Sequence, residues 1–260
     1  MKIEIKKELR YALRSGRLFI LLASFIFFAL LTPIMLKIVL PQVLGSQLGG
    51  GTPQDFTKVM EVTQLGCLQS YMGDVFEIGT IIVVFTLCGL TASEVRENTW
   101  VLPLCAGKRF WHMVGAKLLV FGGMLGMVLI VALLADYGYS GFLLGFEVGV
   151  LPVLFSGLLQ GIYMLFLISC LTAYGVLIKK PIPAGFLTLA TAYGIHFAAS
   201  LLRLQSWTPS GLLAEAQKLM PVLTPSLLTP LAVTALLVTL LIFFSLFRLG
   251  RMEWNTRNTR

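Results

Sequence analysis

Long runs of apolar residues recur through this chain, and they limit the folds open to it. Of its 260 residues, 57% are hydrophobic and only 12% are charged, whereas a soluble domain carries roughly 25% charged residues. Several runs approach about 20 residues, the length that an α-helix needs to cross the hydrocarbon layer of a membrane. Within a bilayer each segment must satisfy its own backbone hydrogen bonds, which selects helices. We therefore predict an all-α polytopic membrane protein.

The apolar runs predict six transmembrane helices within one membrane domain that covers residues 1–260. The six predicted spans are 18–40, 75–93, 114–135, 148–178, 182–202 and 226–247. Between them we predict outer loops at 41–74, with one short helix near 56–68, and at 136–147. Prolines punctuate residues 203–225, which predicts short re-entrant or interfacial helices between the fifth and sixth spans.

The basic residues predict the orientation of the chain in the membrane. The net charge is +8, and an even number of spans puts both termini on one side. Of the 20 Lys and Arg residues, 16 fall on that side, and the other four are Lys37, Lys58, Arg203 and Lys218. The positive-inside rule then places both termini in the cytoplasm. Because the positive residues stand at the ends of apolar runs and form no contiguous basic surface, we predict no nucleic-acid partner.

Residues 2–17 form a basic amphipathic segment ahead of the first span. Ile5, Leu9, Ala12 and Leu13 recur at helical spacing over two turns. This pattern favours an interfacial helix on the anionic lipids of the inner leaflet. The alternative is a charged flank of the first span. The cationic residues that would anchor the segment to the lipid surface are Lys6, Lys7, Arg10, Arg14 and Arg17.

Residues 91–117, between the second and third spans, are dense in charges of both signs. We predict a cytoplasmic loop that docks on a partner protein. Exposed apolar residues within a charged loop are typical of a protein contact, although tryptophans can also belong to the aromatic belt of a membrane protein. Asn98 or Thr99 could cap a short helix there, which Pro103 would end. The candidate docking residues are Glu94, Arg96, Glu97, Trp100, Leu102 and Leu104.

The sequence contains no recognisable catalytic motif. It has no P-loop, since Gly107-Lys108 is followed by Arg109, and it has no His-Glu-x-x-His. Asp74 and Asp136 stand at predicted span ends, too shallow for an intramembrane aspartyl dyad. The four cysteines form no Cys-x-x-Cys pair, so we predict no metal site. We expect a chain that is not an enzyme and binds no cofactor itself.

One face of the fifth predicted span carries small and hydroxyl residues at steps of three and four. These residues are Gly185, Thr188, Ala192 and His196. Such a face lets two helices approach closely and hydrogen-bond to each other. Two interpretations stay open. Either the face packs on a neighbouring helix, with His196 donating to a carbonyl, or it lines a substrate pathway or a seam between subunits.

Over nearly its whole length the chain resembles the ABC-2 type permeases, the membrane subunits of ATP-driven exporters. In that family the loop after the second span holds an acidic residue, Gly-Thr, an apolar stretch with a proline, an arginine, and Gly-Lys at the third span. The matching residues here are Glu94 or Glu97, Leu102-Pro103-Leu104, Arg109 and Ala116-Lys117. Asn98-Thr99 stands where Gly-Thr is usual, and the spacing before Lys117 differs slightly.

The resemblance implies that the loop contains a coupling helix, which fits a groove on a separate ATP-binding cassette subunit. ATP and Mg²⁺ would be bound in that subunit, and a second permease copy or a related permease would complete the pathway. It also implies a multi-pass protein of the plasma membrane, in a bacterium the cytoplasmic membrane. Apolar spans with scattered threonines suit an amphipathic, lipidic, peptide or drug-like cargo.

Three other classes of function remain as alternatives, and one of them is a non-transporting sensor or scaffold. A substrate-binding membrane component of a vitamin or metal importer also has about six spans, but it needs neither the charged loop nor the basic N-terminal segment. An intramembrane enzyme would need paired polar residues deep in the spans, where charges are costly and usually functional. The predicted spans contain almost none.

Overall fold

The computed structural model describes residues 2–47, 63–219 and 225–252, and within these ranges the chain forms helices and no strand. Six of its helical segments are long and apolar enough to cross a membrane, as predicted. They are Arg17–Val43, Gln64–Arg96, Phe110–Leu144, Val150–Ile178, Pro181–Leu201 and Ser226–Gly250. The all-helical fold and the number of candidate spans are therefore confirmed.

The first two spans are each assembled from shorter helices that run on into one another. Each contains one turn of π-helix, η1 or η2, in which the helix is widened by an extra residue. The elements up to the first loop are α1 (Lys2–Arg14), α2 (Arg17–Ile34), η1 (Met35–Val39), α3 (Leu40–Gln47), α5 (Gln64–Asp74), η2 (Val75–Gly79), α6 (Thr80–Leu87) and α7 (Gly89–Arg96). The remaining elements are α8 (Val101–Cys105), α9 (Phe110–Leu144), α10 (Val150–Ile178), α11 (Pro181–Leu201), η3 (Gln205–Trp207), α12 (Gly211–Gln217) and α13 (Pro225–Gly250).

The second span begins eleven residues before the predicted start, so the loop prediction is wrong for 64–74. The Gln and Gly content of this stretch is typical of a loop, but α5 buries Leu68 and Tyr71 and packs on α2 and α9. Tertiary contacts of this kind override weak local propensity. The Thr63 hydroxyl caps the helix by accepting from the Gly66 N–H at 3.2 Å. The short helix predicted near 56–68 lies partly outside the described residues.

The third span also exceeds its prediction, because α9 continues to Leu144. The predicted loop at 136–147 is thus helical over most of its length. The rest of the predicted loop is held in place by the buried side chain of Gln64, which is far away in the sequence. Gln64 donates to the Tyr137 carbonyl at 3.1 Å and accepts from the Glu147 N–H at 2.8 Å. This amide fastens the start of the second span to the α9–α10 connection.

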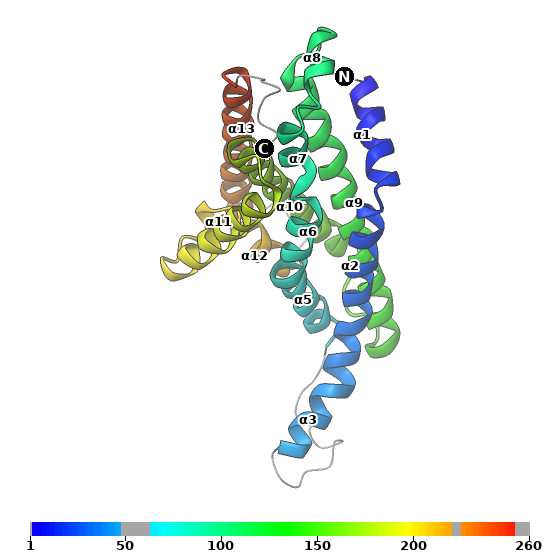
Figure 1. Cartoon of the computed structure of the whole chain (residues 1–260). Helices are drawn as coiled ribbons and strands as arrows, with labels where there is room; N and C mark the ends of the chain where they lie inside the picture. The colour runs from blue at the N-terminus through cyan, green and yellow to red at the C-terminus, as the bar shows by residue number, and fades with distance from the viewer. Residues whose placement is uncertain (1, 48–62, 220–224, 253–260) are drawn as a thin grey trace.

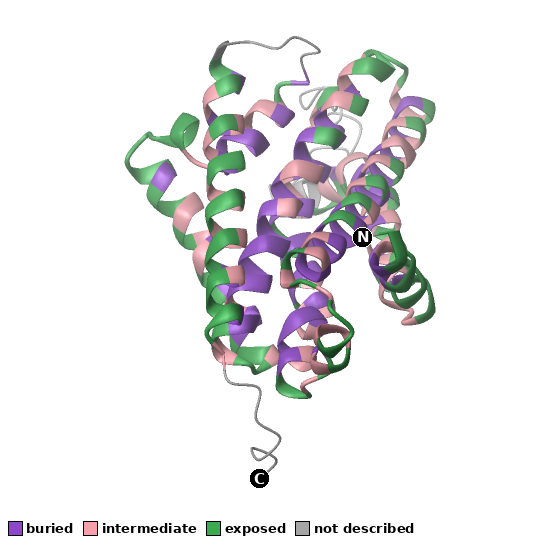
Figure 2. Cartoon of the chain, turned by 90° about the horizontal axis from the view of Figure 1, so that it is seen from above, coloured by how far each residue is buried: buried purple, intermediate pink, exposed green. Residues whose placement is uncertain are grey.

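Helix α10 is the centre of the bundle and packs on α7, α9, α11, α12 and α13. Buried residues gather on the inner helices and exposed residues on the perimeter (Figure 2). Glycines let α10 approach its neighbours closely. A Cβ added at Gly161 would lie 3.1 Å from the Gly126 Cα of α9, and one at Gly175 would lie 3.1 Å from the Ala92 nitrogen of α7. Small residues serve this purpose in membrane helices.

The fifth and sixth spans lie at the edge of the molecule. In the most apolar part of α13 only 17% of the residues are buried. The corresponding share is 33% in α11 and 67% in α10. Short helices, η3 and α12, lie between them in the chain, as predicted for this stretch, and α12 buries Leu212 and Ala216. The N-terminus and α8 lie together at one end of the molecule, which we call the loop end, and α3 lies at the other end (Figure 1).

Candidate functional site

The loop between the second and third spans is held in shape by its own backbone. Asn98 adopts a left-handed conformation, with φ of 54°, and turns the chain after α7. The Thr99 N–H donates back to the Glu94 carbonyl at 3.1 Å. Pro103 lies within α8, where we predicted that it would end a helix. The prediction is wrong because Pro103 falls in the first turn, whose N–H groups need no partner within the helix.

A buried lysine connects three helices at the loop end. Lys117 of α9 is 1% exposed. Its ammonium lies 3.0 Å from the Glu8 carboxylate of α1 and 2.9 Å from the Glu94 carboxylate of α7. The second oxygen of Glu94 accepts the indole N–H of Trp100, which stands just before α8. We call Glu8, Glu94, Trp100 and Lys117 the buried ion cluster, and it ties α1, α7, α8 and α9 together.

A second ion pair holds the start of α1. The Lys108 ammonium pairs with the Glu4 carboxylate, which is itself buried. The hydrogen bond from Lys108 lowers the pKa of Glu4 below its ordinary value of 4.5, although burial opposes the shift. Helix α1 is therefore attached at two levels, four residues apart, which is about one helical turn.

The predicted docking residues divide into two groups. Trp100 is 1% exposed, so the prediction that it belongs to an exposed apolar cluster is wrong; its indole is needed inside the buried ion cluster. Glu94 is likewise engaged within the chain. Leu102, in contrast, is 80% exposed, and Leu104 is half-buried against the core. The remaining two, Arg96 and Glu97, are exposed and pair with each other at 3.3 Å.

The basic residues of α1 face away from the protein. Lys6, Lys7, Arg10 and Arg14 are exposed, whereas Arg17 is half-buried with its guanidinium carbon 5.4 Å from the centre of the Tyr11 ring. The side of α1 that packs on the bundle is an acidic stripe, which the sequence interpretation missed. Its acidic residues are Glu4 and Glu8, and the buried Ala12 continues the same side of the helix. Their spacing of four residues is the signal that could have identified it.

The small-residue face of α11 serves mainly as a packing surface. A Cβ added at Gly185 would lie 3.3 Å from the Cys88 Cβ, while Thr188 and Ala192 are buried. The Thr188 hydroxyl donates to the Ala184 carbonyl of its own helix at 2.8 Å. His196 differs from these three residues, because it borders a cavity.

That cavity, of about 220 Å³, lies beside η2 and is lined by polar groups that include Glu77, His196, Gln205 and Gln217. The His196 ring packs 4.5 Å from the Phe76 ring, centre to centre. Its buried Nδ1 has no hydrogen-bond partner among the described residues, so the expected bond to a carbonyl is not made by that atom. The Tyr193 hydroxyl donates to the Glu77 carbonyl at the same place.

Two aspartates lie deeper in the helices than the sequence predicted. Asp136 is completely buried within α9, and neither carboxylate oxygen has a hydrogen-bond partner in the described part of the chain. Asp74 ends α5 and continues directly into η2. Its Oδ2 lies 2.9 Å from the Thr32 hydroxyl of α2. The placement at span ends is therefore wrong, because the helices extend beyond the apolar runs.

No protein-family model, curated protein or solved structure matches this chain.

Proposed function

We propose that the chain is the permease subunit of an ATP-driven exporter of the ABC-2 type, embedded in the cell membrane. ATP and Mg²⁺ would bind to a separate ATP-binding cassette subunit. The observation that carries the proposal is Leu102, an exposed large apolar side chain on α8. The base of this helix is fixed by the buried ion cluster. A protruding apolar residue on a rigid support is the arrangement that a protein contact requires.

The docking surface in this proposal consists of Leu102, Arg96 and Glu97, with Leu104 behind them. Glu94 and Trp100 act as supports, because their side chains are occupied inside the chain. A force on α8 would reach α7 through Glu94 and α9 through Lys117. Through Glu8 it would reach α1 as well. The loop thus acts as the coupling helix, moving three helices as a unit when the ATP-binding subunit changes shape.

The proposed orientation places the loop end in the cytoplasm together with both termini. The exposed cations of α1 would then lie against the anionic inner leaflet, which makes α1 an interfacial helix. The short helices η3 and α12 would be re-entrant or interfacial elements on the outer side.

The weakly buried α11 and α13 leave a broad apolar perimeter for a second copy of the chain or a related permease. Such a partner would complete the transport pathway. The cavity beside Glu77 and His196 is the best candidate for part of that pathway, because it brings polar groups together within the spans.

The importer component and the intramembrane enzyme account for fewer of these observations. A substrate-binding importer component would not need Leu102 exposed on a braced helix. An intramembrane aspartyl enzyme needs two carboxylates that share a proton. The hydrogen bonds of the described residues join Asp74 to Thr32 and not to Asp136.

The test is purification of the tagged full-length chain from the cells that make it, in lipid nanodiscs, with measurement of ATP hydrolysis. We expect a co-purifying chain with a P-loop, identified by mass spectrometry, together with its ATPase activity. Leu102→Asp should reduce both at least tenfold. Leu202→Asp, at an equally apolar exposed position after α11, is the matched control and should leave both unchanged. Absence of a P-loop chain, or equal recovery with both variants, would contradict the proposal.

A further inference from the structure

The two π-helical turns of the chain border the same pocket. Met35 and Leu36, the first residues of η1, line one side of it, and Ile78 of η2 lines the other. A π turn interrupts the regular hydrogen bonding of a helix and occurs frequently at functional sites. Two such turns lie on facing helices of the first two spans and border one pocket. This makes the pocket a candidate functional site.

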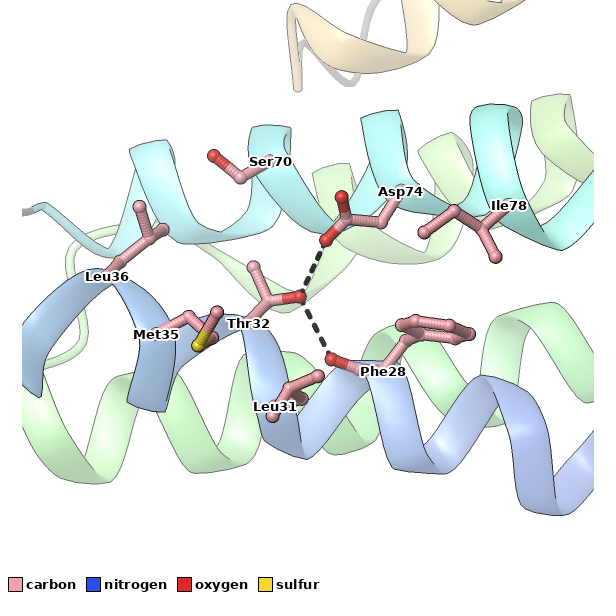
Figure 3. A pocket seen from close by; sticks show the side chains of 8 residues that line it. All are labelled: Phe28, Leu31, Thr32, Met35, Leu36, Ser70, Asp74 and Ile78. Atoms are coloured by element: carbon pink, nitrogen blue, oxygen red, sulfur yellow. Dashed lines mark hydrogen bonds between the residues drawn. The ribbon is translucent and has the colours of Figure 1, made fainter. Parts of the chain in front are cut away.

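The pocket combines a carboxylate with an apolar lining. Its volume is about 330 Å³, within the range of roughly 300–1,000 Å³ typical of small-molecule sites. Figure 3 shows Asp74 and Thr32 pointing toward each other from α5 and α2. The full lining is Phe28, Leu31, Thr32, Met35, Leu36, Ser70, Asp74 and Ile78.

Among the described residues, the Asp74 carboxylate receives only one hydrogen bond, from Thr32. The Thr32 hydroxyl oxygen lies 2.9 Å from Asp74 Oδ2 and also 2.9 Å from the Phe28 carbonyl, and it has one proton for both. An ionised carboxylate can accept about four hydrogen bonds. One shared hydroxyl proton therefore satisfies only a small part of this group.

No cationic side chain of the described residues pairs with Asp74. Lys37 is close in sequence to the pocket, but its ammonium donates to the Leu143 carbonyl at 2.6 Å. Ionisable side chains within membrane-spanning helices are rare and are usually functional. Within the part of the chain that the structure describes, the carboxyl group in this pocket therefore has no cationic partner.

We propose that this pocket binds an amphipathic organic cation. Its ammonium group lies against Asp74 and Thr32, and its hydrocarbon part lies against Phe28, Leu31 and Ile78. The inference rests on the proposed function and names the class of its substrate. The apolar lining favours an organic body over a metal ion. Moreover, no group of three or more metal-binding side chains occurs in the described part of the chain.

The position of the pocket suits a ligand that enters from the membrane. Met35 is 47% exposed and Ile78 43%, so the pocket opens at the outer surface of the bundle, where lipid would lie. Asp74 is 20 residues before Glu94 in the second span, or roughly 30 Å at 1.5 Å per residue. This is about the thickness of the hydrocarbon layer. With Glu94 at the inner boundary, the carboxylate lies near the outer boundary, where a cationic headgroup also resides.

The experiment measures binding to the isolated chain in nanodiscs of zwitterionic lipid, with empty nanodiscs as background. The probes are radiolabelled decylammonium, whose N–H groups can donate to Asp74, the neutral decanol and the anionic decyl sulfate. We expect saturable binding of the cation alone. Asp74→Asn, which keeps the shape of the side chain, should weaken it at least tenfold. Glu147→Gln removes a carboxylate that is exposed in the α9–α10 connection and does not line this pocket, so it is the control and should leave binding unchanged.

A second variant keeps the proposal testable if Asp74→Asn does not fold. Ile78→Trp fills the pocket and retains the carboxylate, and it should also abolish saturable binding of the cation. The proposal is overturned if decanol binds as tightly as the cation, or if Asp74→Asn and Glu147→Gln weaken binding equally. It is also overturned if these substitutions change only the fraction of dimer in mass photometry, which would make the pocket a contact between copies.

This binding assay uses no nucleotide and no partner subunit, so its outcome is separate from that of the co-purification test. Cation binding without a P-loop partner would remove the proposed function and keep the site. Recovery of a P-loop partner without cation binding would remove the proposed cation site and keep the proposed function.

Discussion

Lys117 is a charged side chain inside a largely apolar bundle, and its two carboxylate partners account for its burial. Removing one member of a buried ion pair leaves the others desolvated and unpaired, which costs about 3–5 kcal/mol. We therefore predict that Lys117→Met lowers the thermal unfolding temperature markedly. Lys7→Met is the control, because Lys7 pairs with the same Glu8 at 3.7 Å from a half-exposed position. Exposed pairs contribute about 0–1 kcal/mol. Similar melting temperatures for the two variants would refute a central role for Lys117.

Asp136 presents the opposite case, a buried carboxyl group without a partner among the described residues. Burying such a group without a compensating hydrogen bond or ion pair is unfavourable. Asp136→Leu replaces this polar group by an apolar side chain of similar size, so we predict a higher melting temperature than that of the wild-type chain. The measurement is thermal unfolding in the same nanodiscs. A lower melting temperature would mean that Asp136 has a stabilising partner in the assembled protein.

Residue roles in the loop could be predicted only in part. The exposure of Leu102 follows from its place in a charged loop. The burial of Trp100 does not follow, because it depends on Glu94 and on Lys117, which lies 17 residues further along the chain. A sequence pattern shows which residues are apolar or charged. It does not show which of them meet across a turn.

At the scale of single helices, α1 is held to the bundle by charge. Its apolar residues Leu9 and Leu13 are 40% and 60% exposed, whereas Glu4 and Glu8 are buried. The apolar stripe in the sequence predicted an amphipathic helix correctly. It did not identify the side that contacts the protein, because that side is chosen by Lys108 and Lys117.

The pH dependence of α1 docking follows from Glu4. Its pKa is lowered in the folded chain, chiefly by the hydrogen bond from Lys108, so its contribution to stability is complete above about pH 4.5 and is lost as the pH falls through the lowered pKa. We predict that hydrogen-exchange protection of α1, corrected for intrinsic rates, is constant from pH 7 to pH 5 and falls below pH 4.5. Glu4→Gln should reduce protection already at pH 7. A gradual loss between pH 7 and pH 5 would contradict this assignment.

The contact between α9 and α10 depends on the absence of a side chain at Gly161. A Cβ there would lie 3.1 Å from the Gly126 Cα, whereas a Cβ at Gly123, also on α9, would have no atom within 4 Å. We predict that Gly161→Val destabilises the chain by about 1–3 kcal/mol more than Gly123→Val, since only the first forces the helices apart. Both variants add the same side chain to a helix, so their difference isolates packing. Equal melting temperatures would show that the contact is looser than described.

At the scale of the whole molecule, the number of spans could be predicted because the thickness of a membrane sets the length of an apolar run. The ends of the helices could not be predicted in this way. The second span starts at Gln64 and the third continues through Asp136, both polar residues. Gln64 is accommodated because the α9–α10 connection supplies its hydrogen-bond partners. The pocket at Asp74 was missed for the same reason, since it forms only when α2 and α5 are brought side by side.

The orientation of the whole molecule can be tested with a natural cysteine. Cys105 of α8 is exposed at the loop end, whereas Cys67 and Cys170 are buried and Cys88 is half-buried. The distribution of basic residues predicts that the loop end lies in the cytoplasm. We predict that a membrane-impermeant maleimide leaves Cys105 unlabelled in sealed right-side-out vesicles and labels it after permeabilisation.

The control is Glu147→Cys in a Cys105→Ser background. Residue 147 is exposed in the α9–α10 connection, at the end of α9 opposite to the loop, so it should be labelled in sealed vesicles. The reverse pattern would place Leu102 outside the cell, where no cytoplasmic ATP-binding subunit could reach it. Because it requires no ligand and no partner, this measurement can reject the proposed function before either is sought.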